Sequence, residues 1–296
     1  MCGDCFRRMM CYNRIRKDGY VSMKKNKKLK QKIPYYTNKA TLAVYLVLRA
    51  LVILALVRSA LRRDFESVFL CSLTLLLLIL PSIFTRKLQI ELPGTLEIII
   101  LLFIFAAEIL GELNSFYIRV PNWDTMLHTL NGFLCAAIGF ALVDMLNRSD
   151  RFSFKLSPVY LAIVAFCFSM TVGVLWEFFE YFGDVVLGLD MQKDTVLGAI
   201  RTVELDPTRS NKVVAVRQIA DVIVIHGDGT QQALGLGGYL DVGLHDTMKD
   251  LIVNFIGAVV FSIIGFFYVK EKGKGRFAAR FIPRVLRRQD KQTGDE

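Results

Sequence analysis

Cysteine and histidine occur too rarely in this chain, and at the wrong spacings, to build a disulfide framework or a zinc finger. The sequence contains six Cys and three His. Cys2 and Cys5 form a C-x-x-C, but no second pair and no His lies at zinc-finger distance, so neither a thiolate metal site nor a redox motif is favoured. Three further cysteines lie in apolar stretches and are expected to behave as small hydrophobic residues: Cys71, Cys135 and Cys167.

Nucleotide-binding and leader signatures are also missing. The glycine-rich stretch "GLGGYLDVG" (residues 235–243) lacks the Lys-Ser/Thr of a P-loop, and it is not placed between a strand and a helix, so no nucleotide is expected. The first apolar stretch has no small-residue cleavage pattern, and no internal repeat supports an inverted-repeat transporter. Met23 opens the basic run "MKKNKKLK", so a start at Met23 would make residues 1–22 a mis-assigned extension.

Basic charge is scarce outside the two ends of the chain. The formal net charge of +10 arises from residues 1–39, with 12 Lys/Arg against two acids, and from residues 270–296, with nine against four. The residues between them carry 16 Lys/Arg against 21 acids. This distribution is typical of a multi-pass membrane protein with both termini in the cytoplasm, and it argues against a nucleic-acid partner.

Long apolar segments, by contrast, are abundant. The chain is 53% hydrophobic, with a mean hydropathy of +0.42. About 20 apolar residues cross the hydrocarbon core of a bilayer. By this measure we expect about six membrane spans, at residues 41–57, 65–84, 94–113, 125–146, 157–187 and 248–268. The sequence therefore predicts an all-α polytopic membrane protein whose main partners are membrane lipids.

The connection between the last two spans predicts a small, partly β cap outside the cytoplasm. It contains the β-like run "VVAVRQIADVIVI" (213–225), followed by the turn "HGDG". The expected organisation is a basic cytoplasmic tail (1–39), helices one to five (40–187), the cap (188–245), helix six (246–269) and a second basic cytoplasmic tail (270–296).

Polar residues of four spans should meet at one end of the bundle, because spans 94–113 and 157–187 run outward while 125–146 and 248–268 run inward. These residues are Glu108, Glu112, Asp124, His128, Glu177, Glu180, Asp184, Asp246, Asp250 and Asn254. Those on spans four to six are spaced to share one helix face in each span. Small residues continue these faces into the membrane and allow close helix packing. We therefore expect one polar centre inside the bundle.

Several carboxylates at one depth need compensation, because a charged side chain costs about 2.5–3.5 kcal/mol at the centre of a membrane helix. A divalent cation is one solution, with ligands from Asp124, His128, Glu177, Glu180, Asp246 and Asp250. This oxygen-rich set suits Mn, Mg, Fe or a catalytic Zn, whose bound water would act as nucleophile or base. Protons shared among the carboxylates are the other solution, as in a proton relay or coupled transporter.

We expect Glu177, Glu180 and Asp250 to act as catalytic acids or bases, surrounded by Glu108, Glu112, Trp123, Trp176 and Asn254. Simpler interpretations stay open. Asp124 and Asp246 fit helix N-caps, and the Trp residues, with Tyr117 and Tyr181, fit an interfacial aromatic belt. Glu177 and Glu180 lie near a helix C-terminus, where the helix dipole disfavours acids, so capping does not explain them. Arg49 is interpreted as an internal pairing residue, with a substrate contact as the alternative.

Three motifs carry a resemblance to a known family. They are "WDTMLH" (Trp123 to His128), "WEFFE" (Trp176 to Glu180) and "DVGLHDTMKDL" (Asp241 to Leu251). In this order the chain resembles the YjdF-like bacterial inner-membrane proteins over roughly residues 95–268. It departs from them in the reduced approach "FYIRVPNW" and in the long 188–245 insertion. The resemblance implies a bacterial cytoplasmic membrane and a shared polar centre, and it implies no reaction.

Three functional hypotheses follow. The first is a membrane protein whose carboxylate/His centre, at the outer end of the bundle, binds a divalent metal and acts on a lipid head group or a cell-envelope substrate. The second is a proton-coupled transporter or permease that uses the same acids as a relay. The third is a non-catalytic membrane scaffold.

Overall fold

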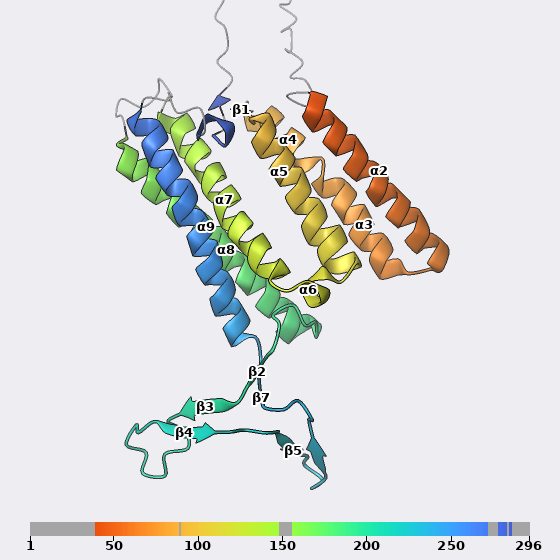
Figure 1. Ribbon diagram of the computed structural model, residues 1–296, viewed down its shortest axis with the longest axis vertical. Helices are drawn as coiled ribbons and strands as arrows, with labels where there is room; N and C mark the ends of the chain where they lie inside the picture. Colours follow the sequence, from red (N-terminus) through yellow and green to blue (C-terminus); the bar gives the residue numbers. More distant parts are fainter. Residues whose placement is uncertain (1–38, 89, 148–155, 272–277, 283, 286–296) are drawn as a thin grey trace, which may run out of the picture. The chain divides into compact units, whose positions relative to one another are not determined.

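The computed structural model describes residues 39–88, 90–147, 156–271, 278–282 and 284–285 (Figure 1). The helices are α2 Lys39–Arg62, α3 Phe65–Leu77, α4 Leu80–Leu88, α5 Gly94–Phe105, the π-helix η1 Ala106–Leu113, α6 Phe116–Arg119, α7 Trp123–Asn147, α8 Pro158–Leu187, α9 Leu244–Lys270 and the 3-10 helix η2 Ala278–Arg280. Most residues of the two predicted basic tails, together with Cys2 and Cys5, lie outside the described ranges.

Five helical segments are long and apolar enough to cross a membrane: Lys39–Arg62, Phe65–Ile83 (α3 with the first residues of α4), Trp123–Asp144, Pro158–Leu187 and Leu244–Lys270. The predicted class, a helical polytopic membrane protein, is confirmed. The remaining predicted span, 94–113, consists of α5 followed without a break by η1, so neither piece alone has the length of a span. Large apolar side chains stay exposed along α2, α8 and α9, as expected of surfaces that face lipid.

The predicted window 65–84 contains a break between α3 and α4. The Leu78 N–H still donates to the carbonyl four residues earlier, that of Thr74, at 2.9 Å. The Ile79 N–H instead donates to the carbonyl three residues earlier, that of Leu76, at 3.1 Å. Pro81 has no N–H to offer to the turn before it. The proline therefore explains why one apolar window gives two helices.

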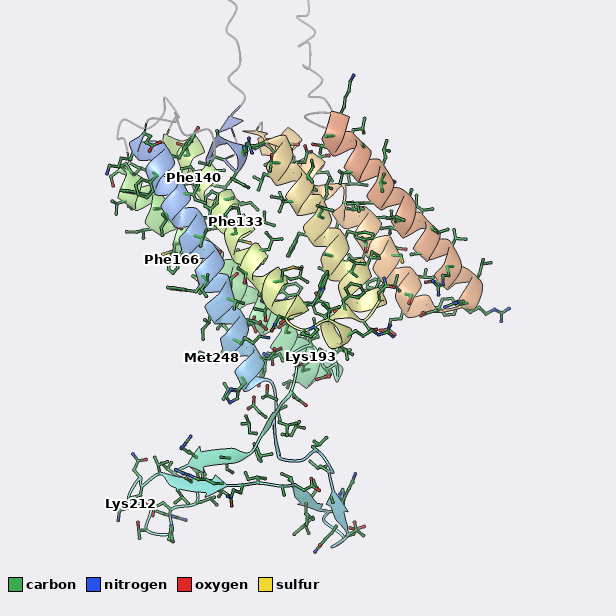
Figure 2. The ribbon with its side chains drawn as sticks, in the orientation of Figure 1. Phe133, Phe140, Phe166, Lys193, Lys212 and Met248 are labelled. Carbon is green, nitrogen blue, oxygen red and sulfur yellow. The ribbon has the colours of Figure 1, made fainter. Side chains whose placement is uncertain are left out.

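Helices α7, α8 and α9 pack tightly against one another (Figure 1). Phe133 and Phe140 project from α7, and both rings contact Phe261 of α9 edge to face, with centroids 5.2 and 6.0 Å apart (Figure 2). Such ring pairs add stability beyond the apolar area they bury. Helices α2, α3, α5 and η1 form a second packed group around the buried Tyr45, Leu48, Val52, Cys71, Leu78, Leu101 and Ile109.

The connection between α8 and α9 contains six short strands: β2 Thr195–Leu197, β3 Ala199–Thr202, β4 Val214–Arg217, β5 Ile223–Ile225, β6 Gln231–Ala233 and β7 Tyr239–Asp241. They pair antiparallel as β2–β7, β3–β4 and β5–β6. Two-residue strands β1 Ile90–Glu91 and β8 Arg284–Val285 form a further pair. The predicted β run 213–225 is split into β4 and β5, because Gln218 has φ +56°, outside the extended region.

The loop between β3 and β4 is organised around one carboxylate. Asp206 Oδ1 accepts hydrogen bonds from the N–H and hydroxyl of Thr208, and Oδ2 accepts from the N–H groups of Ser210 and Lys212 at 2.8 and 3.1 Å. The Thr208 hydroxyl and these backbone donors hold the pKa of Asp206 well below its usual range. The hydrogen bonds to the ionised carboxylate thus fix the conformation of this loop.

Replacing Asp206 with Ala is expected to speed amide hydrogen exchange at residues 208, 210 and 212. The effect depends on pH with a defined sign. Because the pKa of Asp206 is lowered on folding, its contribution is present above the pKa of an unfolded Asp, about 3.9, and is lost only as pH falls through the folded value. Asp228→Ala is the control, since the Asp228 carboxylate accepts only local bonds from Thr230. Equal exchange in Asp206→Ala and the parent would contradict this account.

Candidate functional site

Two glycines let α7 and α9 approach until their backbones touch. A Cβ on Gly132 would lie 2.1 Å from the Asn254 carbonyl oxygen, and a Cβ on Gly257 would lie 2.0 Å from the Thr129 carbonyl oxygen. Both obstacles are backbone atoms, which cannot swing aside as a side chain can. Only glycine permits this contact, and it brings the first turns of α7 beside those of α9.

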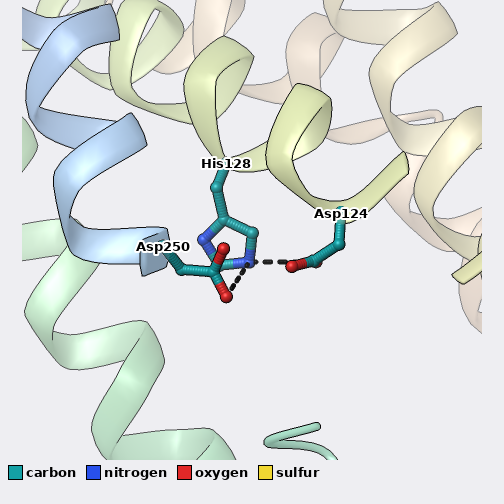
Figure 3. Close-up of side chains that lie close together, drawn as sticks. All are labelled: Asp124, His128 and Asp250. Carbon is teal, nitrogen blue, oxygen red and sulfur yellow. Dashed lines mark ion pairs between the residues drawn. The ribbon is translucent and has the colours of Figure 1, made fainter. Parts of the chain in front are cut away.

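Three ionisable residues meet where the two helices begin (Figure 3). His128 Nε2 lies 3.3 Å from Asp124 Oδ1 on the same helix and 3.9 Å from Asp250 Oδ2 on α9. One ligand atom from each of Asp124, His128 and Asp250 can be chosen so that all three lie within 4.8 Å of one another. The other ring nitrogen, Nδ1, faces α8 and lies 3.8 Å from Glu177 Oε1. The histidine is thus ringed by carboxylates from three helices.

The centre is enclosed, yet its oxygens are incompletely paired. His128, Glu177 and Asp250 are 8%, 4% and 1% exposed. Among the described residues, no hydrogen-bond partner is found for the buried atoms Asp124 Oδ2, Glu177 Oε2 and Asp250 Oδ1. Burying an ionised oxygen without a partner is unfavourable. Bound protons or a cation would compensate the charge of these oxygens. Their geometry fits a ligand set of carboxylate oxygens and one imidazole nitrogen.

Two other predicted site residues on α8 have partners of their own. Glu180 Oε1 accepts a 2.8 Å hydrogen bond from the indole N–H of Trp176, one turn earlier. Asp184 accepts bonds from the N–H groups of Met191 and Gln192, at 2.5 and 2.9 Å, and so fixes the chain that leaves α8. Trp176 is therefore tied to the polar centre through Glu180, in addition to lying on the exposed surface.

Asp246 is engaged in holding that same connection to α9. Its Oδ2 accepts a 2.8 Å hydrogen bond from the Lys193 N–H, and its Oδ1 lies 3.8 Å from Lys249 Nζ. The Gln192 amide also donates to the Thr247 hydroxyl. Asp246 therefore has partners of its own, while the three residues whose ligand atoms lie close together, here called the trio, are Asp124, His128 and Asp250.

A second polar layer lies deeper in the bundle and supports the first. Asn254 Oδ1 lies 3.4 Å from the Asn131 amide nitrogen, while its own amide donates to Met170 Sδ at 3.6 Å. Ser169 donates a 2.7 Å hydrogen bond to the Gly132 carbonyl. Asn254 is 1% exposed. This predicted residue therefore links α7, α8 and α9 one turn beyond Asp250.

Glu108 and Glu112 lie on η1, outside the trio, and Tyr117 lies between the two sets of acids. The Tyr117 ring packs where a Cβ on Gly111 would be, 2.4 Å from that position. Burial raises the pKa of Tyr117, and the carboxylates of Glu112, Asp124, Glu108 and Glu180 raise it further. The sequence predicted Tyr117 as part of an aromatic belt and did not predict that it lies near these acids. The closeness of Tyr117 to the Trp123–His128 motif was the one signal available.

Trp123 and Arg49 contact aromatic residues outside the trio. The Trp123 ring packs edge-on against Phe116 with centroids 5.0 Å apart. Arg49 places its guanidinium 5.7 Å from the centre of the Tyr45 ring on its own helix and donates a hydrogen bond to the Tyr45 hydroxyl. This contact fits the interpretation of Arg49 as an internal pairing residue.

Comparison with known proteins gives a family and no activity. A family model described as "Predicted membrane protein (DUF2238)" matches residues 44–202, just over half of the 296 residues. An uncharacterised protein of Thermotoga maritima is 27% identical over 127 residues, covering 40% of this chain and 62% of that protein. The chain thus spans less than two thirds of this relative's length. No solved structure matches the chain. The resemblance to YjdF-like membrane proteins agrees with the family match.

Proposed function

Because the chain belongs to the DUF2238 family of predicted membrane proteins, we propose a function at the bacterial plasma membrane: binding of one divalent cation by Asp124, His128 and Asp250, and action on a lipid head group or cell-envelope substrate. The basic charge of both ends of the chain favours a cytoplasmic location for the tails, and with that orientation this centre and the cap face the outside. The observation that carries the proposal is the set of unpartnered buried carboxylate oxygens around His128.

Each residue then has a chemical task. The trio supplies two oxygens and one imidazole nitrogen, a set that suits Mn, Mg, Fe or catalytic Zn and leaves positions open for water and substrate. The cation would act as a Lewis acid on a phosphoryl or carbonyl oxygen. In this proposal Glu177 orients the imidazole through its ion pair with Nδ1. Glu177 and Glu180 exchange a proton with the substrate.

Metal titration of purified protein tests the proposal. We expect the chelator-treated wild type to take up about one equivalent of Mn²⁺ or Zn²⁺, measured by elemental analysis after gel filtration. Asp250→Asn should lose at least about 100-fold in affinity, since changes even around metal ligands lose 10- to 100-fold. Asp246→Asn is the matched control, because Asp246 bonds to the Lys193 backbone and lies outside the trio, and its loss of affinity should be much smaller than that of Asp250→Asn.

The contrary results are equally defined. A wild type that takes up no stoichiometric metal, or an Asp250→Asn protein that binds as tightly as the wild type, would overturn the metal proposal. In the first case the unpartnered oxygens would be satisfied by protons. The polar layer that continues inward through Asn254 and Asn131 favours a proton-coupled transporter as the second candidate. Proton flux in proteoliposomes, lost in Glu177→Gln, would then support that function.

A further inference from the structure

An apolar groove lies between α8 and α9, toward the start of α8 and the end of α9. One end of the groove is lined by Val159, the second residue of α8, and by Phe267, three residues before α9 ends. At the other end the ring of Phe166, labelled in Figure 2, meets that of Phe255 edge to face, with centroids 5.3 Å apart. The volume of the groove is about 720 Å³, within the roughly 300–1,000 Å³ of ligand pockets. Because Asp250 lies in the second turn of α9, the groove is separate from the trio.

The groove has about the length of one leaflet of a bilayer. Both α8 and α9 are long and apolar enough to cross a membrane. Between the lining residues Phe255 and Phe267, α9 rises about 18 Å at 1.5 Å per residue. One leaflet contributes about half of the roughly 30 Å hydrocarbon core. The hydrocarbon chain of a membrane lipid therefore matches the groove in length.

The lining of the groove favours a hydrocarbon chain over another helix. Its surface is almost entirely apolar, and four of its ten lining residues are phenylalanines, whereas only Ala162 and Ser262 are small. Contacts between membrane helices are instead rich in small residues, which let the backbones approach. The contact between α7 and α9 has this composition, through Gly132 and Gly257. A flexible chain can fill the spaces between large rings, and a second helix cannot approach closely there.

A lysine lies at the end of the groove where α9 ends. Lys270 Nζ is 5.7 Å from the centre of the Phe266 ring, and Phe266 lines the groove. Lys270 is exposed, so its ammonium group is free to reach the membrane surface while its apolar stem lies along the ring. Lysine ammonium groups pair with phosphate oxygens. The charge of Lys270 therefore complements the phosphate of a lipid whose chain lies in the groove.

We propose that the groove between α8 and α9 binds one phospholipid, with a hydrocarbon chain against the apolar lining and the phosphate beside Lys270. With the orientation favoured by the basic tails, this lipid belongs to the cytoplasmic leaflet. The site lies toward the opposite ends of α8 and α9 from Glu177 and Asp250, so the proposal does not depend on the metal or on the substrate proposed for the trio.

Filling the groove tests the position of the chain. Ala162→Phe adds a ring to the lining, and Ala50→Phe makes the same change at an exposed position of α2, outside the groove. Bound phospholipid is measured by native mass spectrometry and by phosphate assay after gel filtration in detergent. We expect the wild type and Ala50→Phe to retain one more phospholipid per chain than Ala162→Phe. Equal retention in both variants would overturn the proposal. A wild-type dimer that Ala162→Phe dissociates without loss of phospholipid would also overturn it, because a second copy would then fill the groove.

Neutralising Lys270 tests the position of the phosphate, at an exposed residue whose replacement leaves the packing of the helices intact. The probe is phosphatidylglycerol with two oleoyl chains, added to delipidated protein in detergent. Lys270→Gln should weaken its binding about five-fold, whereas Lys270→Arg should bind as the wild type does. Glu271→Gln is the control for charge at the next residue, and it should not weaken binding. Dioleoylglycerol, which lacks the phosphate, should bind equally to the wild type and to Lys270→Gln. Unchanged phosphatidylglycerol binding in Lys270→Gln would overturn the proposed contact.

Discussion

Gly257→Ala is expected to destabilise the helix bundle, although Ala is the better helix former by about 0.8–1.0 kcal/mol. The added methyl would lie 2.0 Å from the Thr129 carbonyl oxygen and 2.9 Å from the Phe133 backbone nitrogen. Since neither atom belongs to a side chain, α7 and α9 must separate. Overpacking of this kind destabilises by about 1–3 kcal/mol, and a backbone obstacle should bring the loss to the upper end. A loss of stability would therefore show that the steric clash outweighs the higher helix propensity of Ala, and a gain would show the reverse.

Unfolding of the detergent-solubilised protein, followed by circular dichroism, measures this loss. Gly265→Ala is the graded control on the same helix. Its methyl meets only the edge of the Phe140 ring, at 2.9 Å, and a ring has room to tilt. We expect a smaller loss for Gly265→Ala, and metal affinity should fall in Gly257→Ala alone, because Asp250 is carried away from His128. A Gly257→Ala protein as stable as the wild type would show that the close helix contact is not required.

Residue spacing predicted four of the polar side chains that meet, within a larger set that the structure only partly brings together. Asp124 and His128 are four residues apart on one helix, and the same reasoning placed Glu177 and Asp250 opposite them. The structure places the three carboxylates around the His128 imidazole. The prediction succeeded because helix periodicity and the membrane constrain both the face and the depth of a residue. The roles given to these residues remain proposals.

Contacts made by irregular segments could not be predicted in the same way. Asp246 shares the stripe of Asp250, yet its carboxylate binds the backbone of Lys193, which follows α8 by six residues. Tyr117 approaches the acids because the wider turn of η1 and the missing side chain at Gly111 make room for its ring. Neither feature has a periodic signature. Strand propensity likewise does not predict the left-handed backbone at Gln218, which divides β4 from β5.

Asp250→Asn is expected to abolish the stabilisation that divalent metal gives to the wild type. A cation that binds only the folded protein stabilises it by about 2.7 kcal/mol when its concentration is 100 times the dissociation constant. In wild type, thermal unfolding should therefore move to higher temperature as Mn²⁺ or Zn²⁺ is added. The variant should show no such response, because one of three ligand groups has lost its charge.

Without metal, the order of stability should reverse. Asp250 is 1% exposed and lies beside Asp124 and Glu177, so its ionised form suffers both from burial and from like charge. The amide of Asn removes this unfavourable charge, while His128 keeps Asp124 as its partner at 3.3 Å. Asp250→Asn should thus unfold at a higher temperature than the chelator-treated wild type, and Asp246→Asn should keep the metal response. A purely structural centre would give the opposite result, with Asp250→Asn less stable than the wild type and metal without effect on either, because Asp250 would then contribute only its ion pair with His128.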